Sequence, residues 1–165
     1  MAAPAAAEAA TGGRIQTREQ QYAVRVFTQV DAVKQAHKDK DDPYRTKYGA
    51  MAHRLPVLIR TAGLVQALAF LQTRDEKEAA WHDLLGHLAI TVGYKNGAAL
   101  AAQSRNADLG AYMQLTAKVL AALVWYKRFA ESVLNVKSGA EVADDAPPDG
   151  ATAQANSTPA QEAAP

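Results

Sequence analysis

The 165-residue sequence contains no cysteine. This absence excludes a disulfide framework, a thiolate nucleophile and a zinc site built from cysteines. No run of about eighteen apolar residues occurs, so we expect no membrane-spanning helix and no membrane partner. The first residues lack the early positive charges and the long apolar stretch of a secretory signal. A cytoplasmic location is the expectation that follows.

Sequence motifs of catalytic sites are also missing. The chain has no His-Glu-x-x-His, no phosphate-binding glycine loop and no Gly-x-Ser-x-Gly turn. His82 and His87 are five residues apart, which is about 140° around a helix, so one helical face cannot present both to a metal. We therefore expect no catalytic residue, no metal site and no cofactor.

Charge is distributed unevenly along a chain whose net charge is only +1. The segment from Arg14 to Lys137 contains all 18 Lys and Arg but only 11 of the 17 acids, so its net charge is +7. The other six acids lie in the Ala-rich ends of the chain. A basic folded segment favours an anionic partner such as nucleic acid, although ordinary solubility would explain the same excess.

Composition and periodicity divide the chain into three segments. Residues 1–14 and 139–165 are rich in Ala with Pro and Gly and lack apolar periodicity, so we expect two disordered tails, the second of them acidic. Residues 15–138 show the three-and-four spacing of amphipathic helices and no alternating strand pattern. The sequence therefore predicts an all-α fold, a single compact bundle of five or six helices.

Start signals define the first three expected helices. Thr17 and Gln20 have the spacing of a capping box, so the first helix begins at Thr17. A second helix is expected over residues 44–54. Pro56 suits the first turn of a third helix, which would contain Gly63 in its interior.

Three further helices are expected in the second half of the domain. One covers residues 75–92, a short one covers 98–103, and the longest runs from Asn106 or Asp108 to Lys137. Because the first and last helices are long enough to span the domain, we expect them to pair. The large side chains expected in the core include Phe27, Trp81, Leu109, Met113, Trp125, Tyr126 and Phe129.

Basic side chains form two groups that could contact phosphates. Lys47 and Arg54 are seven residues apart and share a helical face, and Arg60 follows in the next expected helix. If Pro56 sets that helix at an angle, the three cations form one cluster, which we favour as the nucleic-acid contact. The structural alternative is that Arg60 pairs with an acid such as Asp108.

The second basic group lies on the first helix. Arg18 and Arg25, with Arg14 before them, form one stripe that is a second candidate for RNA binding. A solvated helix face explains this stripe equally well. Lys127 and Arg128 lie beside Trp125, where they either extend along apolar surface or contact another subunit.

One stretch of the sequence resembles a known family. From Lys47 to Leu71 the chain contains Lys-Tyr, Leu-Pro, Leu-Ile-Arg, Gly-Leu and Ala-Leu-Ala-Phe-Leu in this order. Together with Trp125 and its neighbours, this pattern is similar to the small all-helical subunit of the type III-B CRISPR effector, the Cmr complex. The resemblance extends from Arg18 to about Leu134. Ala62 departs from it, because relatives usually carry Asn there.

The resemblance implies a structural role. Members of that family are non-catalytic, and their copies stack head to tail as an inner filament beside the other Cmr subunits. Their basic surface lines the channel in which target RNA pairs with guide RNA. The alternative from a different class is a stand-alone helical adaptor that binds a protein partner.

Overall fold

The computed structural model describes residues 15–75 and 78–139. It confirms the predicted all-α bundle, because these residues form six helices and no strand occurs among them. The two tails expected to be disordered, residues 1–14 and 139–165, lie outside the described residues except for Gly139.

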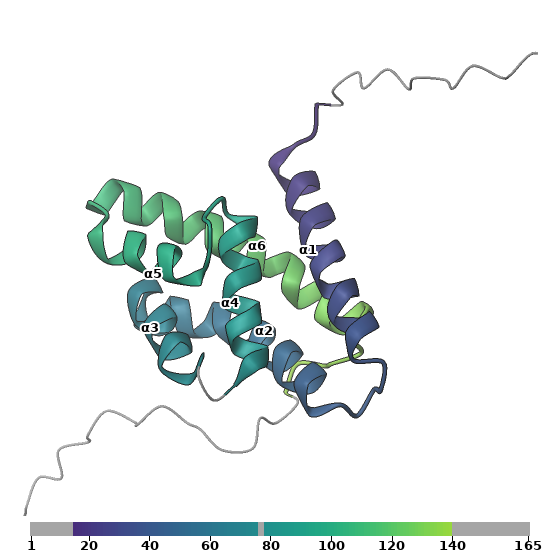
Figure 1. The fold of residues 1–165 in the computed structure, drawn as a ribbon. Coiled ribbons are helices and arrows are strands. Elements are labelled where there is room, and N and C mark those ends of the chain that lie inside the picture. The colour runs from purple at the N-terminus through teal and green to yellow at the C-terminus, as the bar shows by residue number, and fades with distance from the viewer. Residues whose placement is uncertain (1–14, 76–77, 140–165) are drawn as a thin grey trace, which may run out of the picture.

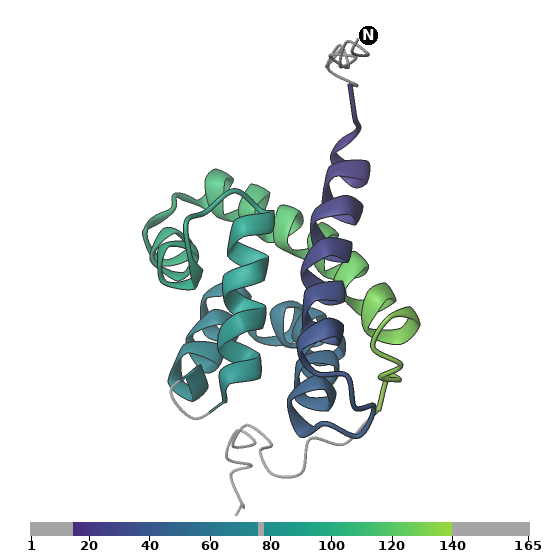
Figure 2. The same cartoon turned by 45° about the vertical axis from the view of Figure 1, so that its right-hand side comes forward.

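The helices pack around one apolar core. In chain order they are α1 (Arg18–Ala36), α2 (Pro43–Ala62), α3 (Leu64–Asp75), α4 (Ala79–Thr91), α5 (Gly97–Asn106) and α6 (Leu109–Ser132). In Figure 1, α4 runs through the middle of the molecule, with α1 on one side and α3 and α5 on the other. Figure 2 shows α1 crossing α6, so the predicted pairing of the first and last helices is confirmed.

Side-chain caps define where α1 and α6 begin. The Thr17 hydroxyl accepts a hydrogen bond from the Gln20 amide at 3.2 Å, and the Gln20 side chain accepts one from the Thr17 amide at 2.9 Å. The predicted capping box is therefore confirmed. Asp108 caps α6 in the same way and accepts from the amide of Ala111 at 2.8 Å.

The predicted helix break at Pro56 is wrong. Pro56 lies inside α2, which continues to Ala62, and the chain turns at Gly63. A proline in a helix interior costs about 3 kcal/mol, but α2 packs against α3, α4 and α6, and that packing offsets the cost. Gly63 has a φ of +86°, which a glycine adopts without steric strain, and it therefore separates α2 from α3.

Some residues expected in the core lie at the surface. Trp81 and Tyr126 are buried as predicted, whereas Leu109 is 74% exposed and Met113 is 63% exposed. Trp125 is half-buried, and so are Phe129 and its partner Phe27, whose rings meet edge to face with centroids 5.5 Å apart. The first turns of α6 therefore extend past the core, which spacing within one helix could not predict.

Helix α6 also ends earlier than expected, at Ser132 rather than Lys137. The residues after it are bound to α2 by two buried polar side chains. The Arg45 guanidinium, which is 1% exposed, donates to the carbonyl of Leu134 at 2.8 Å and to that of Val133 at 3.4 Å. His53 Nε2 donates to the carbonyl of Val136 at 2.9 Å. Because Arg45 lies near the start of α2 and meets the end of α6, the two helices run antiparallel.

Close packing accompanies these hydrogen bonds. A Cβ atom built on Gly49 of α2 would lie 2.6 Å from the Cβ of Val136. Real Cβ atoms do not approach so closely, so only glycine permits the C-terminal segment to lie this near to α2. Gly86 of α4 offers a contrast, because a Cβ there would have no neighbour within 4 Å.

These two glycines give a matched test of the contact. Gly49→Ala should lower the free energy of unfolding by about 1–3 kcal/mol, since the added methyl group overpacks against Val136. Gly86→Ala should leave it unchanged or raise it by up to about 1 kcal/mol, because alanine favours a helix. Urea denaturation of both variants measures the difference. Equal effects would contradict the tight contact with Val136.

Candidate nucleic-acid interface

The predicted cluster of Lys47, Arg54 and Arg60 is not formed. Since α2 continues through Pro56, all three lie on one helix. Arg60 lies six positions after Arg54, so its side chain is turned by about 120° around the helix. Lys47 and Arg54 share a face as predicted, but Arg60 points elsewhere. The expectation failed because it depended on a bend at Pro56 that the helix does not make.

Lys47 is already bound to a carboxylate. Its Nζ lies 2.8 Å from both carboxylate oxygens of Glu78, the residue that precedes α4. The two side chains are 36% and 28% exposed, so the pair is shielded from solvent on most sides. Glu78 therefore joins α2 to α4, and its side chain makes no capping hydrogen bond to its own helix.

Arg54 and the two arginines of the α1 stripe, Arg18 and Arg25, contact aromatic rings or a backbone carbonyl. The Arg54 guanidinium lies 6.0 Å from the centre of the Phe70 ring, and that of Arg18 lies 6.0 Å from the Tyr22 ring. Arg25 is exposed and donates to the carbonyl of Thr91 at 3.4 Å. The contacts of Arg18 and Arg25 orient the two side chains without neutralising them, so these two charges remain available to an anion.

Arg60 lies in a groove between α2 and α6, which we call the α2–α6 groove. The groove has a volume of about 340 Å³, and its lining contains Arg60 together with Lys127 and Arg128. The sequence predicted separate sites for Arg60 and for the Lys127–Arg128 pair, whereas the antiparallel packing of α2 and α6 places them in one groove. No periodicity within a single helix could have predicted this.

The remaining lining of the α2–α6 groove is mostly apolar. Pro56 and Val57 come from α2, and Val124 comes from α6, with Val57 57% exposed and Val124 47% exposed. The lining contains one acidic side chain, Glu131, and three cations. The groove therefore combines a net positive charge with an exposed apolar surface.

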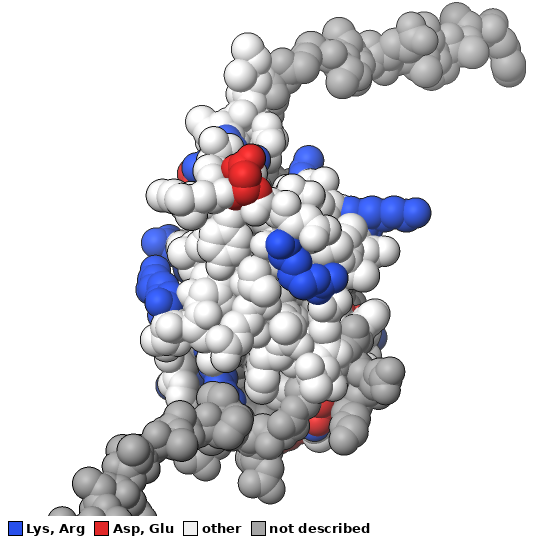
Figure 3. Space-filling model, turned by 90° about the vertical axis from the view of Figure 1, so that its left-hand side faces the viewer, with Lys and Arg blue, Asp and Glu red and all other residues white. Residues whose placement is uncertain are grey.

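Basic side chains do not merge into one continuous patch on the face shown in Figure 3. They form separate groups on a largely uncharged surface, and few acidic side chains interrupt it. Separate cations suit an extended polyanion that touches the protein at several points. Each such contact contributes a small, salt-dependent share of the affinity.

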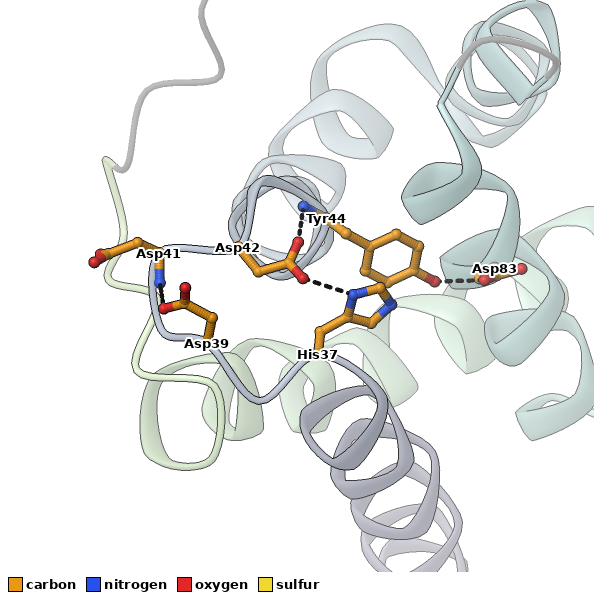
Figure 4. Close-up of polar contacts among 6 residues, drawn as sticks. All are labelled: His37, Asp39, Asp41, Asp42, Tyr44 and Asp83. Carbon is orange, nitrogen blue, oxygen red and sulfur yellow. Dashed lines mark hydrogen bonds and ion pairs between the residues drawn. The ribbon is translucent and has the colours of Figure 1, made fainter.

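Near the turn between α1 and α2, His37, Asp42 and Asp83 form hydrogen bonds that join helices (Figure 4). Nδ1 of His37 lies 2.8 Å from the Asp42 carboxylate, and this hydrogen bond is the main reason why the pKa of Asp42 is lowered. Asp42 also caps α2 by accepting from the Tyr44 amide at 2.8 Å. The Tyr44 ring stacks on His37, and its hydroxyl donates to Asp83 of α4. These groups join three helices.

The histidines do not assemble into a metal centre in the described ranges. His87 is hydrogen-bonded through Nδ1 to the Tyr48 hydroxyl at 2.9 Å, and burial lowers the pKa of His87, which favours a neutral ring. His53 is bound to Val136 as described above. Within residues 15–75 and 78–139, no three His, Asp or Glu side chains are placed to hold a metal ion.

None of the helices in the described part of the chain is long and apolar enough to cross a membrane.

Comparison with known proteins decides the family. The family model of the CRISPR-associated protein (Cas_Cmr5) matches residues 18–133, a range that includes all six helices completely. The chain belongs to this family. The resemblance to the small all-helical subunit of the type III-B Cmr complex is thereby confirmed.

Two relatives of the Cmr5 family show how far the likeness extends. The CRISPR system Cmr subunit Cmr5 of Thermus thermophilus is 43% identical over 121 residues, 73% of this chain and 98% of the relative. A crystal structure of a Cmr5 family protein from the same organism is 39% identical, with a TM-score of 0.63. That match covers 72% of this chain and 97% of the solved one. The helical bundle is thus the part that the family shares.

The Lys47–Glu78 pair can be tested by a double-mutant cycle. Lys47→Met, Glu78→Gln and the double variant should give a coupling free energy of about 0.5–1 kcal/mol, because the pair is only partly exposed. Added salt should reduce the coupling measured by urea denaturation. A coupling free energy of zero would show that Glu78 does not stabilise the Lys47 ammonium group. Lys47 would then be as good a candidate for binding phosphate as the other cations.

Proposed function

We propose that this protein is a non-catalytic structural subunit of a type III-B CRISPR ribonucleoprotein in antiviral defence. In this role it stacks with further copies of itself, binds other subunits of the Cmr complex and contacts target RNA paired with guide RNA in the cytoplasm. The observation that carries the proposal is the family match over nearly the whole helical bundle, residues 18–133. The excess of exposed cations supports the RNA contact.

Among the candidate contacts, Arg60 is the one that we favour most. It is exposed, and none of the ion pairs within the described ranges involves it; Asp108, the acid considered as its partner, caps α6 instead. Arg54, Arg18 and Arg25 are further proposed contacts with the phosphate backbone. Lys47 contributes least, because Glu78 already neutralises it. We assign Lys127 and Arg128 to the contact with a neighbouring subunit, next to the RNA contact of Arg60.

A non-catalytic role is consistent with the hydrogen bonds of two described serines. Ser104 is buried and donates to the carbonyl of Ala101 at 2.7 Å, and Ser132 donates to that of Arg128 at 3.0 Å. Both hydroxyls thus bond within their own helices instead of contacting a histidine that could act as a base. In the proposed complex, the chemistry of RNA cleavage belongs to other subunits.

Affinity purification from cells that carry a type III-B locus tests the proposal directly. The tagged full chain should recover other Cmr subunits, identified by mass spectrometry, and guide RNA, identified by sequencing. The exposed apolar lining of the α2–α6 groove is what favours the alternative, a stand-alone adaptor that binds a protein partner. Recovery of a single protein partner without guide RNA would overturn the proposal in favour of the adaptor.

The RNA contact of Arg60 is tested by salt dependence. We expect the isolated chain to bind single-stranded RNA weakly and without sequence preference. Arg60→Gln should lower the affinity and reduce the slope of log affinity against log salt by about 0.7, because one phosphate contact is lost. Fluorescence anisotropy with labelled RNA measures both quantities.

Lys34→Gln is the matched control for this measurement. Lys34 is exposed on α1 and lies nine residues from Arg25, which is about 180° around the helix and therefore on the opposite side. Its loss removes the same charge and should change the slope much less. If both variants lose the same slope, RNA responds only to total charge and the assignment of Arg60 is wrong.

A further inference from the structure

The α2–α6 groove is a hollow in which positive charge gathers. Arg60, Lys127 and Arg128 are all exposed, and none of the ion pairs within the described ranges involves them. Two other hollows in the described part of the chain, of about 280 Å³ beside α5 and about 190 Å³ between α2 and α3, have no Lys or Arg in their linings. The ligand that suits the α2–α6 groove is therefore an anion.

Apolar side chains form much of the remaining surface that such an anion would meet. Val57 of α2 and Val124 of α6 are exposed, and Pro56 contributes to the same lining. The volume of about 340 Å³ lies at the lower end of the range of about 300–1,000 Å³ for sites that bind small molecules. A phosphate ion alone would leave the apolar floor in contact with water. An anion that also carries a flat apolar group would cover it.

The walls of the groove favour a nucleotide over an extended peptide. Both walls are α-helices, whose backbone N–H and C=O groups are bonded within the helix, and Pro56 has no N–H. An extended peptide on the apolar floor would therefore bury backbone groups that have no partner. A nucleobase presents an apolar face, whereas its donors and acceptors lie on its edges, which can stay in contact with water.

The cations surround the place where the phosphate of such a nucleotide would lie. Arg60 comes from α2, and Lys127 and Arg128 come from α6, so positive charge acts from both walls. The Arg128 guanidinium lies 5.7 Å from the centre of the Trp125 ring, a contact that orients this side chain. A phosphate at Arg60 therefore feels the charge of both helices, even where Lys127 and Arg128 also contact a neighbouring subunit.

We propose that the α2–α6 groove binds one unpaired nucleotide of an RNA strand, with its base on the apolar floor and a phosphate at Arg60. This base site rests on the proposed RNA contact of Arg60 and extends it. Because the floor is aliphatic, it contacts the face of a base and does not read its edges, so every base is accepted. A base that is stacked and paired in a duplex does not present its face, so the nucleotide must be unpaired.

Two single-stranded RNAs of equal length separate the base contact from the phosphate contact. One is an ordinary oligonucleotide, and the other is the same sugar–phosphate chain without bases, so both carry the same phosphate charge. The full chain should bind the ordinary RNA about fivefold more tightly, which is the lower end of what one stacked base contributes. Fluorescence anisotropy at low salt measures both affinities.

Uncharged substitutions on the floor should remove this difference. With Val57→Gln and Val124→Gln together, the two RNAs should bind about equally, while the salt slope stays unchanged because no cation is lost. Val24→Gln with Ile90→Gln is the matched control. Val24 is 56% exposed on α1 and Ile90 is 51% exposed on α4, against 57% for Val57 and 47% for Val124. The control pair should keep the fivefold difference, and thermal melting checks that both variants remain folded.

Photocrosslinking locates the base. A single thiouridine in the ordinary RNA should crosslink to residues 56–60 or 120–128, mapped by mass spectrometry. Crosslinks confined to α1, or loss of the difference in the control pair, would overturn the proposal. Displacement of the RNA by an equal concentration of AMP would also overturn it, because the groove would then take a free nucleotide.

The two RNAs also distinguish failure of the base site from failure of the RNA contact. Equal affinities for the unmodified chain would overturn the base site, whereas a lower salt slope for Arg60→Gln would still support the phosphate contact. If neither RNA binds, the RNA contact itself is wrong and the base site with it. Recovery of other Cmr subunits by affinity purification tests the structural role independently of both.

Discussion

The structure depends on one buried charge at the junction of α2 and α6. Arg45 is almost completely withdrawn from solvent, and burying a guanidinium is costly unless its hydrogen-bonding groups are satisfied. The carbonyls that follow α6 meet this need, since the end of a helix presents unpaired acceptors and partial negative charge. Each partner satisfies the other, so the start of α2 and the end of α6 are held together.

Several other features follow from this junction. With α2 and α6 antiparallel, the last described residues turn onto α2, where Gly49 leaves room for Val136 and His53 bonds its carbonyl. The opposite end is closed by a second polar contact, because the Tyr112 hydroxyl accepts from the amide of Leu64 just after α2 at 2.9 Å. The α2–α6 groove lies between these two contacts. The contacts at the two ends therefore hold α2 and α6 in place, and the cations of the groove do not form these contacts.

Buried polar groups join the other helices in a similar way. The Thr91 hydroxyl of α4 contacts that of Tyr126 on α6 at 2.9 Å and the side chain of Gln29 on α1 at 3.2 Å. Burial raises the pKa of Tyr126, so its hydroxyl stays protonated and able to donate near neutral pH. Such a network fixes how α1 lies on α4 and α6 more specifically than apolar contact would. The α1 stripe of Arg18 and Arg25 depends on that placement.

The sequence by itself determined the local features and the family. Periodicity identified the helical segments but not the boundary between α2 and α3 or the end of α6. The capping box placed the start of α1, and the motif from Lys47 to Leu71 pointed to the Cmr5 family. These signals depend on neighbours three or four residues apart, or on a pattern of residue types, and both can be read along the chain. Only the tertiary structure decided that Pro56 stays within α2 and that Arg45 is buried. It also decided that Arg60 shares a groove with Lys127 and Arg128, because these outcomes depend on contacts between helices that are remote in sequence.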